Sequence, residues 1–157
     1  MKITLIQTGK TTSGYIMKGV EDFASRIRRY IAFELVTVPD LKNTRNMPPA
    51  MQKEKEGKGI TRLLNNDDYI IILDESGKTL STLEFAADLR RIFMMPKKRA
   101  VFIIGGPWGI ADEVRNESDF VLSLSKMTFS HQLVRLLFAE QLYRALTVIN
   151  GDPYHHE

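Results

Sequence analysis

The sequence contains no cysteine and no apolar run long enough to cross a membrane. Without cysteine the chain has no disulfides, no thiolate metal ligands and no cysteine nucleophile, a composition that fits a reducing compartment. The opening stretch MKITLIQTGKTT has too short an apolar run for a signal peptide. We therefore expect a cytoplasmic protein that contains no metal and does not enter a membrane.

The sequence also lacks any Pro-, Gly- or Ser-rich segment that could separate two domains. We therefore expect one domain over residues 1–157. A chain of this length buries roughly two thirds of the surface that its unfolded form exposes, which is enough for a core without disulfides.

Positive charge is unevenly distributed. Residues 1–62 carry 12 Lys/Arg and 6 Asp/Glu, whereas residues 63–157 carry 10 and 13. Such an excess indicates a contact surface for a polyanion such as RNA, although solvated helix faces show it too. The cations that we expect to make these contacts are Arg26, Arg28, Arg29, Lys42, Arg45, Lys53, Lys55 and Lys58.

Apolar runs alternate with amphipathic segments along the chain. Runs typical of strands are KITLIQT, FELVTV, DYIIIL, RAVFIIGG and FVLSLS. Helical patterns fall at about 13–30, 49–64, 82–93, 111–117 and 130–149. Strands separated by helices indicate βαβ units, so we predict an α/β fold with a mainly parallel five-stranded sheet.

The last helical segment, 130–149, is apolar almost all round. Such a helix needs burial on more than one side, either deep in the core or against a second subunit, and we favour a homodimer. Ser130 is suited to cap its start, and Asn150-Gly151 marks its end.

Ligands of open α/β sheets bind outside the carboxyl ends of the strands, and three such ends stand out. Gly105-Gly106 would let a ligand approach the backbone closely, but GGPWG is not the GxGxxG phosphate pattern and could be a plain turn. The loop after Leu124 offers apolar surface beside exposed amides, which suits a flat heterocycle, although Met127 and Phe129 could simply fill the core. The third end is Leu73-Asp74, which we expect to turn through Gly77.

His131 is predicted to lie in the first turn of the last helix, where the helix dipole favours a neutral imidazole. It could be a general base, a ligand donor or a structural residue. Arg135 lies four residues later on the same face. Arg135 and Arg144 could meet a phosphate or carboxylate, or form an ion pair, for instance with Glu140.

Several segments, in order and spacing, resemble the ribosomal RNA large subunit methyltransferase H family. They are MKITLIQTGK, FELVTVPD, KEKEG, ILDESGK, FIIGGPWG, LSLSKMTFSHQLVRLLFAEQLYRA and PYHHE. The resemblance covers essentially the whole chain and implies a single-domain SPOUT fold with a C-terminal trefoil knot and a cofactor site within about residues 70–157. The implied reaction is S-adenosylmethionine-dependent methylation of N3 of a pseudouridine in 23S rRNA, with S-adenosylhomocysteine as product. Ser130 replaces a proline that is frequent in the family.

The same resemblance implies site residues. The expected cofactor contacts are Leu73, Gly105, Leu124, Ser125, Lys126, Met127, Thr128 and Phe129. The candidate catalytic residues are His131, Arg135, Tyr154 and His155, with the PYH tail brought into the active site at the interface of a homodimer. Because a uracil-type N3 carries a proton, one of these groups must help to remove it; which one is left open.

The expected substrate is the assembled ribosome, because a domain this small has little surface with which to read an RNA sequence. Two alternatives follow from the residues. One is a non-catalytic RNA-binding assembly factor on the same fold, and the other is a nucleotide-binding enzyme with a Rossmann-like sheet.

Overall fold

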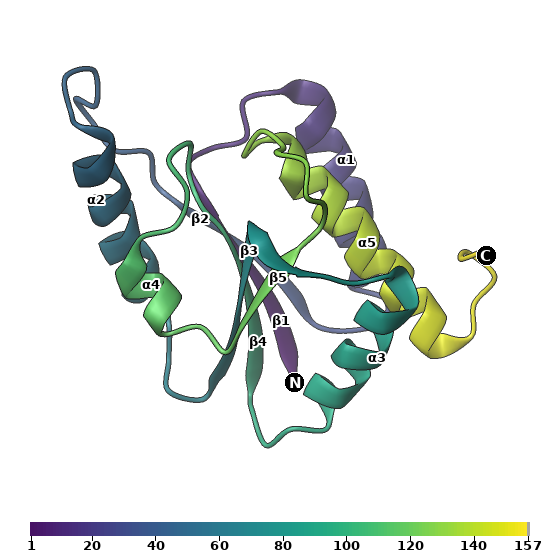
Figure 1. Ribbon diagram of the computed structural model, residues 1–157. Coiled ribbons are helices and arrows are strands. Elements are labelled where there is room, and N and C mark those ends of the chain that lie inside the picture. Colours follow the sequence, from purple (N-terminus) through teal and green to yellow (C-terminus); the bar gives the residue numbers. More distant parts are fainter. Residues whose placement is uncertain (157) are drawn as a thin grey trace.

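The computed structural model describes residues 1–156, in which five strands alternate with five helices (Figure 1). The elements are β1 (Lys2–Thr8), α1 (Gly14–Ile27), β2 (Phe33–Val38), α2 (Pro49–Thr61), β3 (Asp68–Thr79), α3 (Thr82–Phe93), β4 (Arg99–Ile104), α4 (Asp112–Asn116), β5 (Phe120–Ser123) and α5 (Leu133–Asn150). The strand order is β2-β1-β4-β3-β5, and every neighbouring pair is parallel. The predicted α/β class and parallel five-stranded sheet are therefore confirmed.

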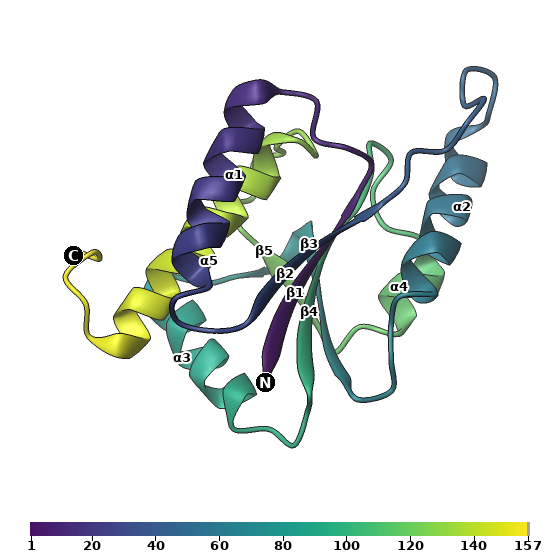
Figure 2. The same cartoon turned by 180° about the vertical axis from the view of Figure 1, so that it is seen from behind.

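Helices cover both faces of the sheet. Helices α1, α3 and α5 lie on one face, and α2 and α4 lie on the other (Figures 1 and 2). Successive side chains of a strand point to opposite faces. Accordingly, Leu5 of β1 belongs to the core under α5 with Phe102 and Phe138, whereas Ile6 packs on the α2 side with Ile103.

Strand β3 does not end at Leu73, so the predicted turn at Gly77 is wrong. The strand continues to Thr79 after a register shift, and Leu122 of β5 lies opposite both Leu73 and Lys78. A Cβ at position 77 would lie 2.6 Å from the carbonyl oxygen of Val121. The glycine therefore permits a close backbone approach within the irregular strand rather than a turn.

The last helix begins later than predicted. It begins at Leu133, and Ser130 precedes it in a separate turn, where its hydroxyl accepts the Leu133 N–H at 3.0 Å. Its end is as predicted, because Gly151 adopts the left-handed conformation, with φ 74°.

Helix α5 is partly buried within its own chain. It packs against α1 and α3, and none of the residues 131–149 is exposed. Packing within the chain, one of the two alternatives, therefore accounts for part of the apolarity of this helix. The homodimer stays a prediction.

Three further expectations concern the chain as a whole. Within residues 1–156, no helix combines the length and apolarity needed to cross a membrane. The single domain and the trefoil knot remain predictions.

Candidate cofactor pocket

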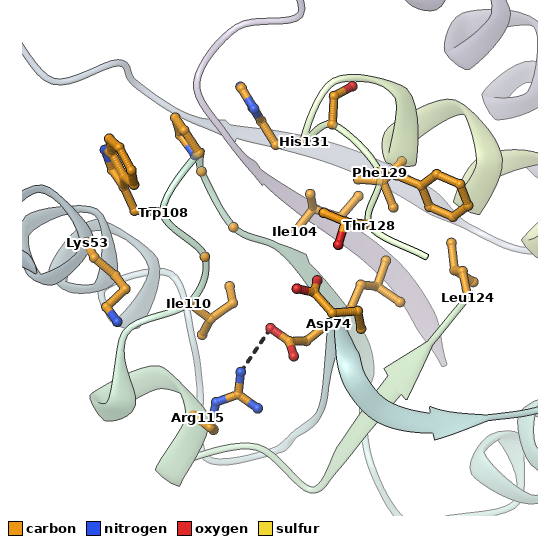
Figure 3. A pocket seen from close by; sticks show the side chains of 18 of the residues that line it. Lys53, Asp74, Ile104, Trp108, Ile110, Arg115, Leu124, Thr128, Phe129 and His131 are labelled. Atoms are coloured by element: carbon orange, nitrogen blue, oxygen red, sulfur yellow. Dashed lines mark ion pairs between the residues drawn. The ribbon is translucent and has the colours of Figure 1, made fainter. Parts of the chain in front are cut away.

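A cavity of about 600 Å³ opens beside the carboxyl ends of β4 and β5, at the level where β3 changes register (Figure 3). Its walls come from three segments that are far apart in sequence, at 73–75, 104–110 and 124–131. Lys53 of α2, Asp112 and Arg115 of α4 and Val134 of α5 complete it. These are the three regions that the sequence indicated, now brought together by the parallel sheet.

Most of the predicted cofactor residues line this cavity. They are Leu73, Gly105, Leu124, Ser125, Met127, Thr128 and Phe129. Lys126 is exposed to solvent and does not line it. Its predicted contact with the cofactor stays a prediction.

The wall after β4 is a tight glycine turn. The Gly109 N–H donates to the Gly106 carbonyl at 3.1 Å, and Gly109 has φ +85°, a conformation that other residues rarely adopt. A Cβ on Gly105 would lie 2.8 Å from the Gly109 carbonyl oxygen. Glycine at these positions keeps the turn narrow and its backbone accessible from the cavity.

The wall after β5 is held by two serines. The Ser123 hydroxyl donates to the Ser125 carbonyl at 2.7 Å, and the Ser125 hydroxyl accepts the Met127 N–H at 3.0 Å. Leu124 and Phe129 lie together on this side of the pocket in Figure 3. Apolar side chains beside a loop backbone provide the kind of surface that binds a flat heterocycle.

An ion pair lies at the edge of the cavity. Arg115 approaches the Asp74 carboxylate at 3.0 Å, as drawn in Figure 3, and Ser76 donates to the same carboxylate from its N–H at 3.0 Å and from its hydroxyl. Burial alone would raise the pKa of Asp74, but the bonds from Ser76 and the Arg115 cation together lower that pKa. The ionised form of Asp74 is therefore favoured, and its charge is paired with that of Arg115.

His131 lines the cavity from the turn before α5. Its pKa is lowered from the ordinary histidine value, first by burial and then by the nearby Arg135 cation, while Asp40 opposes the shift. Both effects favour the neutral form of the imidazole, the form that the sequence analysis expected.

Arg135 does not reach the cavity. Its side chain is fully buried, and its guanidinium donates to the Thr8 carbonyl at 2.6 Å, the Thr11 hydroxyl at 2.8 Å and the His131 carbonyl at 3.0 Å. All of these acceptors belong to the protein. The guanidinium is therefore enclosed in the fold here, and the predicted contact of Arg135 with a phosphate or the base stays a prediction.

The C-terminal tail lies at the opposite end of α5 from the cavity (Figure 1). The Tyr154 hydroxyl donates to Glu140 at 3.2 Å, and the Arg144 guanidinium lies 4.7 Å from the Tyr154 ring centroid. Arg144 also forms an ion pair with Glu140 at 2.5 Å, one of the alternatives left open by the sequence. Tyr154 thus contacts the middle of α5, and neither Tyr154 nor His155 lines the cavity that His131 borders.

Several lining residues were not assigned to this pocket from the sequence, among them Glu75, Trp108, Asp112 and Arg115, and also Lys53, which was expected only to contact RNA. No local motif marks Lys53, because α2 reaches the pocket only through the tertiary fold. Trp108 could have been noticed as a large aromatic inside a glycine turn. Within residues 1–156, no group of three or more His, Asp or Glu side chains is arranged to hold a metal ion.

Comparisons with known proteins agree with this architecture. Residues 1–155 match the family described as "Predicted SPOUT methyltransferase". The chain is 46% identical over 157 residues to the ribosomal RNA large subunit methyltransferase H of Parabacteroides distasonis, with full coverage of both chains. It is 43% identical over 157 residues to the protein of the same name from Flavobacterium johnsoniae, again with full coverage of both.

Solved structures share the fold at low sequence identity. A probable methyltransferase from Bordetella pertussis Tohama I superimposes with a TM-score of 0.57 at 15% identity, over 92% of this chain and 96% of that one. A probable methylase family protein from Haemophilus influenzae Rd KW20 gives a TM-score of 0.50 at 16% identity, over 99% of this chain and 70% of that one.

Proposed function

We propose that this chain, which belongs to the SPOUT methyltransferase family, transfers the methyl group of S-adenosylmethionine to N3 of a pseudouridine in 23S rRNA. The observation that carries the proposal is the cavity of about 600 Å³, whose lining includes the segments that the sequence indicated for the cofactor. The full-length relatives named ribosomal RNA large subunit methyltransferase H support ribosomal RNA as the substrate.

The cavity suits S-adenosylmethionine in its chemistry. Leu124, Phe129 and Ile104 offer apolar surface for the adenine, and the open glycine turn leaves backbone groups available for hydrogen bonds. The carboxylates of Asp74 and Glu75 complement a cationic ligand. When bound, the cofactor supplies an electrophilic sulfonium methyl group and leaves as neutral S-adenosylhomocysteine.

The protein has two tasks, which are to align N3 with the methyl group and to help remove the N3 proton. His131 can accept a proton, because burial and Arg135 keep its imidazole neutral and its ring borders the cavity. Arg135 has a positioning role here, since its guanidinium holds the His131 carbonyl at 3.0 Å. We assign it no direct contact with the substrate.

Tyr154 and His155 require a second subunit in this scheme. They lie at the far end of α5 from their own cavity, so they can act only at the cavity of a partner. We therefore propose a homodimer in which each tail completes the other subunit's site. Because Tyr154 bonds to Glu140, the Arg144–Glu140 ion pair would also lie beside the partner's cavity. There Arg144 could contact a phosphate of the RNA.

The assembled ribosome is the proposed substrate, and the cytoplasm the proposed location. The cations of residues 1–62 would contact phosphates and make binding sensitive to salt. The target base must lie in a loop or be flipped out of its stack to reach the cavity.

The deciding experiment combines calorimetry with transfer of labelled methyl groups to ribosomes that lack the modification. We expect S-adenosylmethionine to bind, and label to enter 23S rRNA at N3 of one pseudouridine. Leu124→Ala should weaken cofactor binding, whereas the control Leu83→Ala, an exposed position of α3, should not. Absence of binding at millimolar cofactor would refute the proposal, and binding without transfer would favour an assembly factor.

A further inference from the structure

Trp108 places an exposed indole at the mouth of the cavity. It is the single tryptophan of the chain, its side chain is 52% exposed, and it borders the cavity. A large aromatic surface left open to water beside a binding site is a common feature of ligand contacts.

A chain of hydrogen bonds fixes the orientation of this indole. The Gln52 amide nitrogen donates to Glu56 Oε1 at 3.0 Å, so the amide oxygen of Gln52 faces Trp108. The indole N–H donates to that oxygen at 3.2 Å. Trp108 is therefore tied to α2 through its one polar atom.

Glu56 anchors the other end of this chain. It is 6% exposed, and a Cβ on Gly106 would lie 2.5 Å from its carboxylate. Glu56 thus packs directly against the glycine turn that carries Trp108. Glu56 therefore packs against the turn and bonds to Gln52, which holds the indole, so the indole is oriented before any ligand arrives.

A cationic side chain lies on the same side of the cavity as this aromatic surface (Figure 3). Lys53 follows Gln52 on α2 and lies on the same side of the cavity as Trp108 in Figure 3. Residues 41–62 carry six Lys/Arg against two Asp/Glu. A pre-oriented aromatic ring beside a basic segment matches the surfaces that bind single-stranded nucleic acids, in which bases stack on rings and cations contact phosphates.

We propose that Trp108 is a stacking platform for an RNA base that flanks the methylated one, with Lys53 at the adjoining phosphate. That the stacked base flanks the methylated base rests on the proposed function. That Trp108 stacks on an RNA base does not. Gln52 and Glu56 are positioning residues that set the plane of the ring.

The single tryptophan provides a direct test. Titration of the wild-type protein with a short RNA hairpin containing the ribosomal target loop should quench its fluorescence, with a salt-dependent midpoint. Trp108→Ala should raise the KM for ribosomes about 5- to 100-fold, the range expected for losing one base stack, while leaving kcat and the Kd of S-adenosylmethionine within about twofold. Trp108→Phe should recover part of the loss, and Gln52→Ala should give an intermediate effect.

Met94→Ala serves as the matched control, because Met94 is 76% exposed and does not line the cavity. An unchanged KM in Trp108→Ala would overturn the platform, as would a selective loss of cofactor affinity or a shift in the dimer equilibrium. RNA-dependent quenching in a protein that transfers no methyl group would support the platform and refute the proposed reaction.

Discussion

The Arg135 guanidinium donates to the backbone carbonyl of Thr8 at 2.6 Å, so the first turn of α5 is tied to the end of β1. The same side chain also holds the carbonyl of His131. One buried cation therefore connects the central part of the sheet to the turn that presents His131 to the cavity.

Arg135→Ala should destabilise the fold by about 2–4 kcal/mol, because it leaves the Thr8 carbonyl without its buried donor and opens a cavity. Urea denaturation measures this change. Arg29→Ala, at an exposed position, should stay within about 0.5 kcal/mol of wild type. Wild-type stability combined with lost methyl transfer would instead support the direct catalytic role that the sequence predicted.

Gly77→Ala should lower the free energy of unfolding by at least about 2 kcal/mol. The new Cβ would clash with the Val121 backbone, which cannot move aside as a flexible side chain can. Thermal unfolding tests this. Gly14→Ala is the matched control, since nothing lies within 4 Å of the added Cβ. Equal effects of the two substitutions would contradict the close strand approach.

The His131 imidazole should titrate below the ordinary histidine value of 6.5 in an NMR experiment. Between that lowered pKa and 6.5, the unfolded chain binds more protons than the native one. The free energy of unfolding should therefore fall as the pH falls through this window. His131→Gln should remove this contribution, and a native pKa at or above 6.5 would contradict the burial of the ring.

The tail substitutions Tyr154→Phe and His155→Ala should reduce methyl transfer without weakening cofactor binding, because the tail lies away from its own cavity. Mixing His131→Ala subunits with Tyr154→Phe subunits should restore part of the activity, since one site of each mixed dimer would be intact. No recovery in verified mixed dimers would contradict the shared site.

Local patterns predicted most of the fold. The helix at 82–93 and the strand FELVTV have the bounds that their sequence indicated, because periodicity and flanking turn residues act locally. The extension of β3 beyond Leu73 could not be predicted in this way, because the register shift depends on pairing with β5. The sequence after Leu73 was interpreted as a turn because glycine is common both in turns and where two strands approach closely.

The site, too, has parts that local sequence patterns predicted and parts that depend on the tertiary fold. Short motifs indicated the walls at Gly105 and Leu124, whereas Lys53 enters through a helix that is distant in sequence. The partners of Arg135 could not be predicted, because an arginine on an apolar helix can contact either a ligand or its own chain. Only the tertiary structure shows that backbone and hydroxyl oxygens of its own chain satisfy the guanidinium.

The position of β4 between β1 and β3 has a consequence for folding. The strand that occupies the middle of the sheet is synthesised fourth, so β1 and β3 cannot be joined until it has emerged. Pairing over such sequence separations makes folding slow. The cavity closes later still, since residues 124–131 follow β5, so newly made chains pass through a stage with much of the sheet assembled and no binding site.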